Sequence, residues 1–193
     1  LRSYQTDLIS RIAADFSSGI QRVCAVAPCG AGKTVVVGWM AGKTALVNKR
    51  VLFLVHRREL IDQSDRTFTA MNIRHGIISA GVPADYESSV QIGSVQTVAR
   101  RLSRIPSPDF IIIDECHRGG ANDEGNWRKI LEYFSPAVQL GLTATPKRKN
   151  NADTYRYFGE PVYVYSLKEG INDGFLTPFK VKQIATTLDD YTY

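Results

Sequence analysis

The chain has 193 residues, of which 44% are hydrophobic and 22% are charged, and its formal net charge is +5. These values suit one α/β domain with a core of useful size. No apolar run approaches the length of a membrane span, and the first residues lack a signal-peptide layout. We therefore expect a cytoplasmic or nucleoid-associated protein without a membrane partner. The mild basic excess is compatible with a polyanionic partner, but an ordinary basic protein explains it equally well.

The chain contains three cysteines, Cys24, Cys29 and Cys116. They are odd in number and lack the spacing of metal ligands, so we expect reduced thiols rather than a disulfide framework. The first residue is Leu1 rather than methionine, which suggests a fragment of a longer protein.

Apolar patterning divides the chain into alternating strands and helices. Short apolar runs predict strands at residues 23–27, 51–55, 90–94, 110–113 and 137–142. Helical spacing predicts helices at residues 1–17, 35–47, 57–71 and 127–134, with another helix beginning within 97–102. Polar and glycine-containing segments predict loops at residues 80–89, 119–125 and 147–153. This alternation predicts an α/β fold with a parallel sheet and right-handed crossovers, whose strand carboxyl ends gather ligands.

The composition shifts after Phe158. We expect a strand at residues 161–165, a short helix at 167–173 and an extended exit at 179–184. Alternating tyrosines are more typical of a half-buried strand than of a stacking surface for single strands, at Tyr155, Tyr157, Tyr163 and Tyr165.

The segment Ala-Pro-Cys-Gly-Ala-Gly-Lys-Thr at residues 27–34 connects a predicted strand to a predicted helix. Its two glycines have no Cβ, so the backbone can curl and direct N–H groups at phosphate oxygens, beside the positive end of the helix dipole. Lys33 can reach the β- and γ-phosphates, and the Thr34 hydroxyl can ligate Mg²⁺. The loop predicts binding of ATP with Mg²⁺, through Pro28, Cys29, Gly30, Ala31, Gly32, Lys33 and Thr34.

Context distinguishes this loop from a chance match. Ala27 stands where the general phosphate-loop pattern has glycine. The last four letters of the loop, Ala-Gly-Lys-Thr, recur at residues 41–44, but there they follow no strand and lie inside the predicted helix. We interpret this second copy as helix surface with a solvated Lys43.

A second chemical element follows the apolar strand at residues 110–113. Asp114 at its carboxyl end can hold Mg²⁺ through the water shell, and Glu115 can orient and deprotonate an attacking water. This acidic pair favours hydrolysis over transfer to a small acceptor, although a polar turn after a buried strand is the plainer alternative. Cys116 and His117 are too few for a metal site, and we expect a hydrogen-bonding role for His117.

The next strand ends in Gly-Leu-Thr-Ala-Thr-Pro at residues 141–146. The hydroxyls of Thr143 and Thr145 can hydrogen-bond to the acidic pair and to neighbouring backbone. By itself the segment is an ordinary turn, but its position after the acidic strand favours a coupling element.

The ordered set of motifs resembles the first motor domain of superfamily 2 DNA helicases and translocases, a three-layer RecA-like fold. The set comprises LRSYQ at 1–5, the loop at 27–34, HRRELIDQ at 56–63, GSVQT at 93–97, DECH at 114–117 and TATP at 143–146. The resemblance points to the DEAH/DECH-type group, which holds repair helicases and the motor subunits of type I and type III restriction enzymes. It covers nearly the whole chain, including FGEP, YSL and DGFL at residues 158–161, 165–167 and 173–176.

The resemblance implies roles for further residues around the nucleotide. Arg2 and Gln5 would lie against the adenine, or else be ordinary helix-start residues. His117, Thr143 and Thr145 would couple hydrolysis to domain movement. The strand that ends at Thr143 would lie between the phosphate-loop strand and the strand that ends at Asp114.

The resemblance also implies contacts with nucleic acid. Arg57 and Arg58 would contact its backbone, or else cap a helix and pair with Glu59. A second backbone-contacting segment would comprise Ser94, Gln96 and Thr97. The basic run at residues 147–149 lies along the nucleic-acid path or in a solvated loop.

The implied function is ATP hydrolysis that drives movement on nucleic acid, DNA rather than RNA. Residues 1–180 would form the motor domain, and residues 181–193 would lead to a second RecA-like domain that supplies an arginine finger. Alone, the chain would bind ATP, hydrolyse it slowly and not unwind duplexes. A restriction-enzyme motor and a non-processive nucleic-acid-sensing switch remain alternatives, whereas the acidic pair disfavours a small-molecule kinase.

Overall fold

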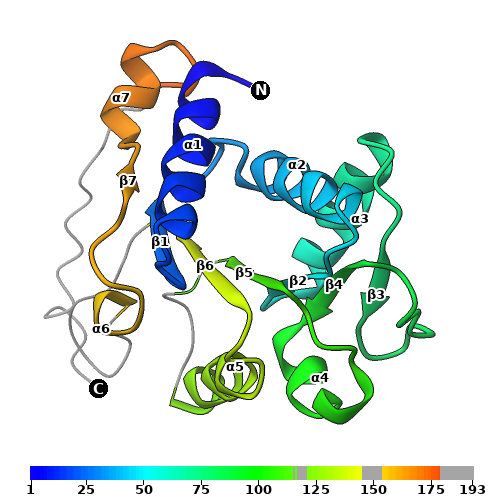
Figure 1. Cartoon of the computed structure of the whole chain (residues 1–193). Coiled ribbons are helices and arrows are strands. Elements are labelled where there is room, and N and C mark those ends of the chain that lie inside the picture. Colours follow the sequence, from blue (N-terminus) through cyan, green and yellow to red (C-terminus); the bar gives the residue numbers. More distant parts are fainter. Residues whose placement is uncertain (115, 117–120, 145–153, 179–193) are drawn as a thin grey trace, which may run out of the picture.

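A seven-stranded sheet organises the chain in the computed structural model, which describes residues 1–114, 116, 121–144 and 154–178 (Figure 1). The strands are β1 (Arg22–Val26), β2 (Val51–Val55), β3 (Gly76–Ile78), β4 (Val90–Ser94), β5 (Phe110–Asp114), β6 (Val138–Thr143) and β7 (Tyr163–Val164). The helices are α1 (Ser3–Ser17), α2 (Lys33–Leu46), α3 (Arg58–Ala70), α4 (Val95–Ala99), α5 (Ala121–Tyr133), α6 (Thr154–Phe158) and α7 (Leu167–Asn172), with a 3₁₀ turn at Leu102–Arg104.

The strand order is β3-β4-β2-β5-β6-β1-β7, and every pair in it is parallel. The expected α/β fold with a parallel sheet is therefore confirmed. β6 lies between β1 and β5, as the resemblance implied for the strand that ends at Thr143. This order brings the carboxyl ends of β1 and β5 to the two sides of one strand, at the same edge of the sheet.

Helices cover both faces of the sheet and make a three-layer structure. Side chains of α1, α2 and α3 pack in one core, and those of α4, α5 and α6 pack in another on the opposite face (Figure 1). Strand β5 contributes to both cores, because successive side chains of a strand point to opposite faces. Phe110 and Ile112 enter the first core, whereas Ile111 and Ile113 enter the second. This burial on both faces explains why the strand is a continuous apolar run.

Several expected boundaries were wrong. Helix α4 begins at Val95 rather than within 97–102, because Ser94 caps it by accepting a hydrogen bond from the Thr97 amide. Residues 121–125, expected in a loop, lie in α5. Tyr157 lies on α6 and not on a strand, so its spacing from the later tyrosines carries no strand periodicity.

The edge strand β3 and the single-turn helix α6 escaped prediction because each is too short to establish an apolar period. The expected loop at 147–153 and the exit at 179–184 lie outside the described residues. Among the helices described, none has both the length and the apolar character needed to cross a bilayer.

Candidate nucleotide-binding site

The loop between β1 and α2 is curled by two glycines in the left-handed region. Gly30 has φ +83° and Gly32 has φ +72°, backbone conformations that glycine adopts without steric cost. Gly32 is also the N-cap residue of α2, so the free amides of the first helical turn face the end of the loop. The backbone is therefore curled as the sequence predicted, in a geometry that can direct N–H groups at an anion.

The loop is held by the start of α1 and by β6. The Tyr4 hydroxyl and the Gln5 amide nitrogen both donate to the Ala31 carbonyl, at 2.7 and 3.0 Å. On the other side, the Ala27 amide donates to the Thr143 carbonyl at 3.0 Å. The loop therefore starts from a fixed strand and is anchored again near its tip.

A cavity of about 520 Å³ opens beside the loop and joins the two predicted chemical elements. Lys33, Thr34 and Asp114 all line it. Lys33 arrives at the start of α2, and Asp114 arrives at the carboxyl end of β5, across the intervening β6. Their convergence follows from the strand order, because parallel strands end at one edge of the sheet.

The lysine of the loop lies over its own backbone. Lys33 Nζ donates to the Ala27 carbonyl at 3.2 Å and lies 3.5 Å from the Pro28 carbonyl. A phosphate entering the cavity can replace these long contacts to neutral carbonyls with shorter hydrogen bonds between opposite charges.

The donor set suits a magnesium ion that accompanies a nucleotide. Thr34 supplies a hydroxyl oxygen and Asp114 a carboxylate oxygen, and both are hard ligands of the kind Mg²⁺ prefers. Asp114 is only 7% exposed. Within the described residues, no group of three or more histidine, cysteine, aspartate or glutamate side chains could hold a metal by itself. The residues therefore fit an ion that takes further ligands from phosphates and water.

The two residues predicted at the adenine occupy different environments. Gln5 is buried, and its Oε1 accepts from the Arg2 amide at 2.9 Å while its Nε2 binds the loop. The guanidinium of Arg2 lies 4.8 Å from the centre of the exposed Phe175 ring. Neither side chain lines the cavity beside the loop, which we call the nucleotide cavity. Gln5 thus makes its described contacts with backbone, and Arg2 extends over a solvent-facing aromatic ring.

The predicted nucleic-acid contacts follow two other strands at the same edge. Arg57 and Arg58 come after β2 and are both exposed, and Arg57 also lines the nucleotide cavity. Ser94 ends β4, and its hydroxyl lies 3.1 Å from Thr97 Oγ1 and 3.4 Å from Gln96 Oε1. Thr143 is fully buried. Three further predicted site residues lie outside the described residues, namely Glu115, His117 and Thr145.

Helix α3 contributes polar residues that sequence reasoning missed. Glu59, Gln63 and Thr67 line the nucleotide cavity opposite the loop. They recur every four residues and so form one stripe along the helix. A polar stripe on the helix after β2 was the available signal, but only the packing of α3 beside α2 shows that the stripe faces the cavity.

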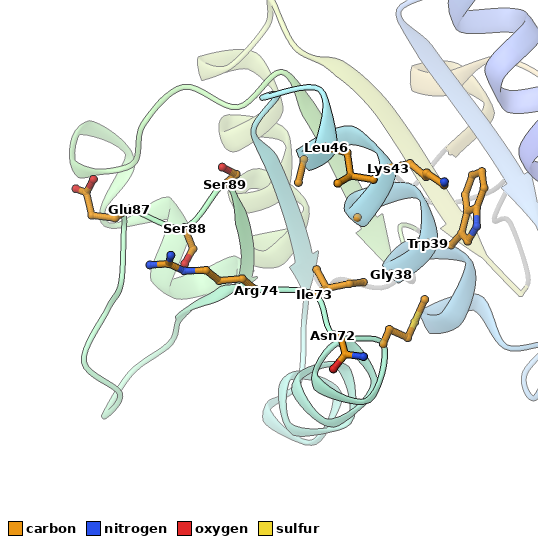
Figure 2. Close-up of a pocket in the computed structure, with 13 residues that line it drawn as sticks. Gly38, Trp39, Lys43, Leu46, Asn72, Ile73, Arg74, Glu87, Ser88 and Ser89 are labelled. Atoms are coloured by element: carbon orange, nitrogen blue, oxygen red, sulfur yellow. The ribbon is translucent and has the colours of Figure 1, made fainter.

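A second hollow, of about 490 Å³, lies near the amino-terminal ends of β3 and β4, whereas the first cavity lies at the carboxyl ends of the strands (Figure 2). Its lining includes residues 71–74, which precede β3, and residues 87–89, which precede β4. Lys43 lies on its wall beside Trp39, with Nζ 5.6 Å from the centre of the indole ring. Volume does not distinguish the hollows, because a third hollow, which includes Phe16 and Pro108 in its lining, is larger at about 760 Å³. The chemistry of the lining makes the cavity beside the phosphate loop the candidate nucleotide site. The repeated Gly-Lys-Thr is remote from it.

The fold and this cavity define a nucleoside-triphosphate-binding domain of the phosphate-loop, three-layer α/β class. The model of the family described as type III restriction enzyme, res subunit, matches residues 1–148, and the chain belongs to this family. The expected superfamily 2 helicase-like first motor domain is thereby confirmed.

Comparison with individual relatives supports the same family. The chain is 40% identical over 200 residues to the EcoAI type I restriction enzyme endonuclease subunit of Escherichia coli, covering 97% of this chain and 24% of that protein. A fragment structure of an HsdR-type subunit from Vibrio vulnificus YJ016 aligns with a TM-score of 0.67 and 36% identity, covering 90% of this chain and 32% of that one. The UvsW helicase of bacteriophage T4 shares the fold, with a TM-score of 0.61 and 18% identity over 86% of this chain and 59% of that one. The chain thus spans about a quarter of the EcoAI subunit and about a third of the Vibrio fragment.

Proposed function

We propose that this chain is the ATP-binding motor domain of a restriction-enzyme endonuclease subunit, in which ATP hydrolysis drives movement along DNA. The observation that carries the proposal is the single cavity shared by Lys33, Thr34 and Asp114. Family membership and the 40% identity to the EcoAI subunit support the restriction-enzyme context. A structure of the LlaBIII type ISP restriction-modification enzyme bound to DNA shares this fold at 22% identity over 93% of this chain and 16% of that one, with a TM-score of 0.72.

The residues of the cavity act on the triphosphate. Lys33 and the amides that follow Gly32 bind its oxygens and stabilise the charge that develops during phosphoryl transfer. Thr34 and Asp114 hold Mg²⁺, which when bound neutralises phosphate charge. Glu115 orients and deprotonates the attacking water. Residues 1–180 form the motor domain in this proposal, and Arg2 and Gln5 lie toward the adenine side.

Movement requires more than this domain. An arginine finger from a second RecA-like domain raises phosphoryl-transfer rates by about 10³–10⁵. The 193-residue chain alone therefore binds ATP, hydrolyses it slowly and does not separate DNA strands. Thr143, Thr145 and His117 couple the nucleotide state to the position of that second domain. Robust unwinding by the chain alone would contradict this part of the proposal.

The test compares the two Gly-Lys-Thr copies in the full-length protein. ATPase activity is measured with and without duplex DNA for Lys33→Ala, Glu115→Gln and the matched control Lys43→Ala. We expect DNA-stimulated turnover to fall at least about 100-fold in the first two variants and to remain within about twofold in the control. DNA-stimulated turnover that survives Lys33→Ala overturns the assignment.

A displacement assay then tests movement. A translocating motor removes a triplex-forming strand from duplex DNA in an ATP-dependent reaction, and a helicase also separates the duplex. Displacement of the triplex strand supports the proposed motor. ATP-dependent changes in DNA affinity without any displacement would instead identify a non-processive switch and would overturn the proposed movement.

The DNA-binding proposal has a separate test in salt. Arg57 and Arg58 are exposed after β2, and removing one side chain that binds a DNA phosphate should reduce the slope of log affinity against log salt by about one. We expect this for Arg57→Ala and Arg58→Ala but not for Arg74→Ala, an exposed arginine in the second hollow, near the amino-terminal ends of β3 and β4. Equal slopes in all three variants would contradict the proposed contacts of Arg57 and Arg58.

A further inference from the structure

We propose that Tyr4 is a positioning residue for the phosphate loop and that the segment at residues 165–176 holds Tyr4 in place. The late segment of the chain thereby controls nucleotide affinity from outside the cavity. The inference rests on the nucleotide site proposed above and adds a control element to it.

The first step is the orientation of one peptide group. The Tyr4 hydroxyl donates to the Ala31 carbonyl at 2.7 Å in a fully buried contact, and Gln5 adds a second donor at 3.0 Å. In a planar trans peptide the next N–H points opposite to the carbonyl. Fixing the Ala31 carbonyl toward α1 therefore turns the Gly32 N–H away from α1. Ala31 is 2% exposed and lies in a small space with Tyr4 and Gln5, whereas Gly32 lines the nucleotide cavity.

The second step is the support of the Tyr4 ring. It stacks on Tyr165 with ring centres 4.1 Å apart and planes inclined by 4°. Both tyrosines are buried, at 5% and 4% exposure. The Tyr165 hydroxyl in turn donates to Asp173 Oδ2 at 2.8 Å, next to the end of α7. Burial and the adjacent Asp173 raise the pKa of Tyr165, so its phenol keeps the proton that it donates.

The third step is direct contact of the same segment with the loop. A Cβ placed on Gly30 would lie 3.2 Å from Leu176 Cδ2, so Leu176 packs against the loop backbone. Leu176 is held by its amide, which donates to the Gly170 carbonyl at 2.8 Å. The Phe175 ring also contacts Tyr4, with centres 5.3 Å apart. Figure 1 shows α7 beside the beginning of α1.

These contacts make residues 165–176 one side of a clamp on the loop. Tyr4 connects this segment to the loop through its stacked ring and its hydroxyl, and Leu176 contacts the loop directly by van der Waals packing. A displacement of the segment removes both supports at once. The Ala31–Gly32 peptide then gains rotational freedom, and the Gly32 N–H is no longer oriented before phosphate arrives.

The experiment separates the hydroxyl from the ring. Binding of ATP, ADP and inorganic tripolyphosphate to this chain is measured by calorimetry with Mg²⁺. Tyr4→Phe keeps the stacked ring and removes the hydroxyl, which donates to Ala31 and accepts only a long contact of 3.5 Å from the Arg2 guanidinium. We expect about 3- to 10-fold weaker binding of all three ligands. Equal weakening for tripolyphosphate, which has no base, identifies an effect on phosphate and not on adenine.

Tyr157→Phe is the matched control. The Tyr157 hydroxyl is also buried and also donates at 2.8 Å, to Gln139 Oε1, but it lies in the core on the opposite face of the sheet. We expect unchanged affinity for all three ligands despite a comparable decrease in thermal stability. Equal weakening in Tyr157→Phe and Tyr4→Phe would overturn the inference, because it would show a general response to removal of a buried hydroxyl.

Phe175→Ala tests the outer part of the clamp. Phe175 is 36% exposed, so its truncation leaves the core intact, and we expect about threefold weaker binding of ATP and tripolyphosphate. Wild-type affinity in both Tyr4→Phe and Phe175→Ala would overturn the inference. In that case, Lys33→Ala shows which proposal fails. Normal binding of tripolyphosphate by Lys33→Ala would contradict the proposed nucleotide site, whereas loss of binding would leave the site intact and contradict only the clamp.

Discussion

The two Ala-Gly-Lys-Thr segments, at residues 31–34 and 41–44, place identical letters in opposite structural roles. In the first, Gly32 has φ +72° and Lys33 lines the nucleotide cavity. In the second, all four residues lie within α2 and Lys43 is exposed over Trp39. The tetrapeptide therefore does not specify phosphate binding. Phosphate binding depends on the elements around the tetrapeptide. Strand β1 fixes where the loop starts, and α1 fixes the direction of the Ala31 carbonyl.

The contacts of the first residue of each copy show the difference most directly. The Ala31 carbonyl accepts from two side chains of α1, whereas Ala41 is a fully buried helix residue in the core between α2 and the sheet. In the interior of a helix the backbone carbonyls and amides bond to one another, so residues 41–44 leave no amide free for a ligand. A loop leaves its amides free only if other elements hold it. Substitutions paired across the two copies test this explanation.

The largest effect on activity is expected at Asp114, which lines a cavity with Lys33 and Thr34 of the first copy. Asp114→Asn should lower the ATPase rate of the full-length protein more than about 100-fold, because the carboxylate at the end of β5 no longer binds Mg²⁺. The control is Asp109→Asn, the same change immediately before the same strand, which should retain full activity. Comparable losses in the two variants would show that the end of the strand has no special chemistry.

The next effect concerns the two threonines. Thr34→Ala should weaken Mg²⁺-dependent ATP binding by about 10-fold, since it removes a hydroxyl ligand. Thr44→Ala should leave affinity unchanged, because Thr44 Oγ1 donates to the Met40 carbonyl within its own helix at 2.8 Å. Calorimetric titration of ATP with and without Mg²⁺ measures both. An Mg²⁺-independent loss in Thr34→Ala would contradict the proposed ligand.

The glycines provide the third comparison, in unfolding free energy. Gly32→Ala places a Cβ at φ +72°, 2.7 Å from Gln5 Nε2, and should destabilise the fold by about 1–2 kcal/mol. Gly42→Ala meets only Ile73 carbons at 3.4 and 3.5 Å and should stabilise α2 by up to about 1 kcal/mol. Urea denaturation gives both values, and shifts of the same sign would break the comparison.

The smallest effect lies beside the second copy, at Asp109. Its carboxylate accepts from Lys49 Nζ and from the Arg50 amide, each at 2.8 Å, and these bonds hold its pKa below the ordinary value of 3.8. Stability from such a lowered pKa is present above the ordinary value and is lost as the pH falls through the folded-state value.

Asp109→Asn should therefore destabilise the fold by only about 0.5–1 kcal/mol at pH 7, because the Asp109 side chain is 39% exposed and solvent screens the pair. The difference from wild type should disappear in strongly acidic solution, measured by urea denaturation across pH. A constant difference at every pH would show that the charge of Asp109 is not the cause.

Much of this molecule could be predicted from local pattern. The apolar run Val51–Val55 predicted its strand with correct ends. The phosphate loop and the acid after residues 110–113 together predicted that Lys33, Thr34 and Asp114 lie close to one another, and all three line one cavity. Two short elements, Gly76–Ile78 and Thr154–Phe158, were not predicted, because each is too brief to establish an apolar period. The cavity face of α3 was also missed, because a polar stripe at Glu59, Gln63 and Thr67 looks the same whether it faces solvent or a ligand.

The sequence by itself determined the main strands, the curled loop and the position of Asp114 at the end of a strand, because these depend on short apolar runs and on glycine dihedral angles within a few residues. Only the tertiary structure decided that Tyr4 and Gln5 hold the Ala31 carbonyl and that Tyr165 and Leu176 close on the same loop. Those contacts bring the two ends of the described chain to one loop. Their geometry depends on how α1 and α7 pack around β1 and the loop, and no local pattern encodes that.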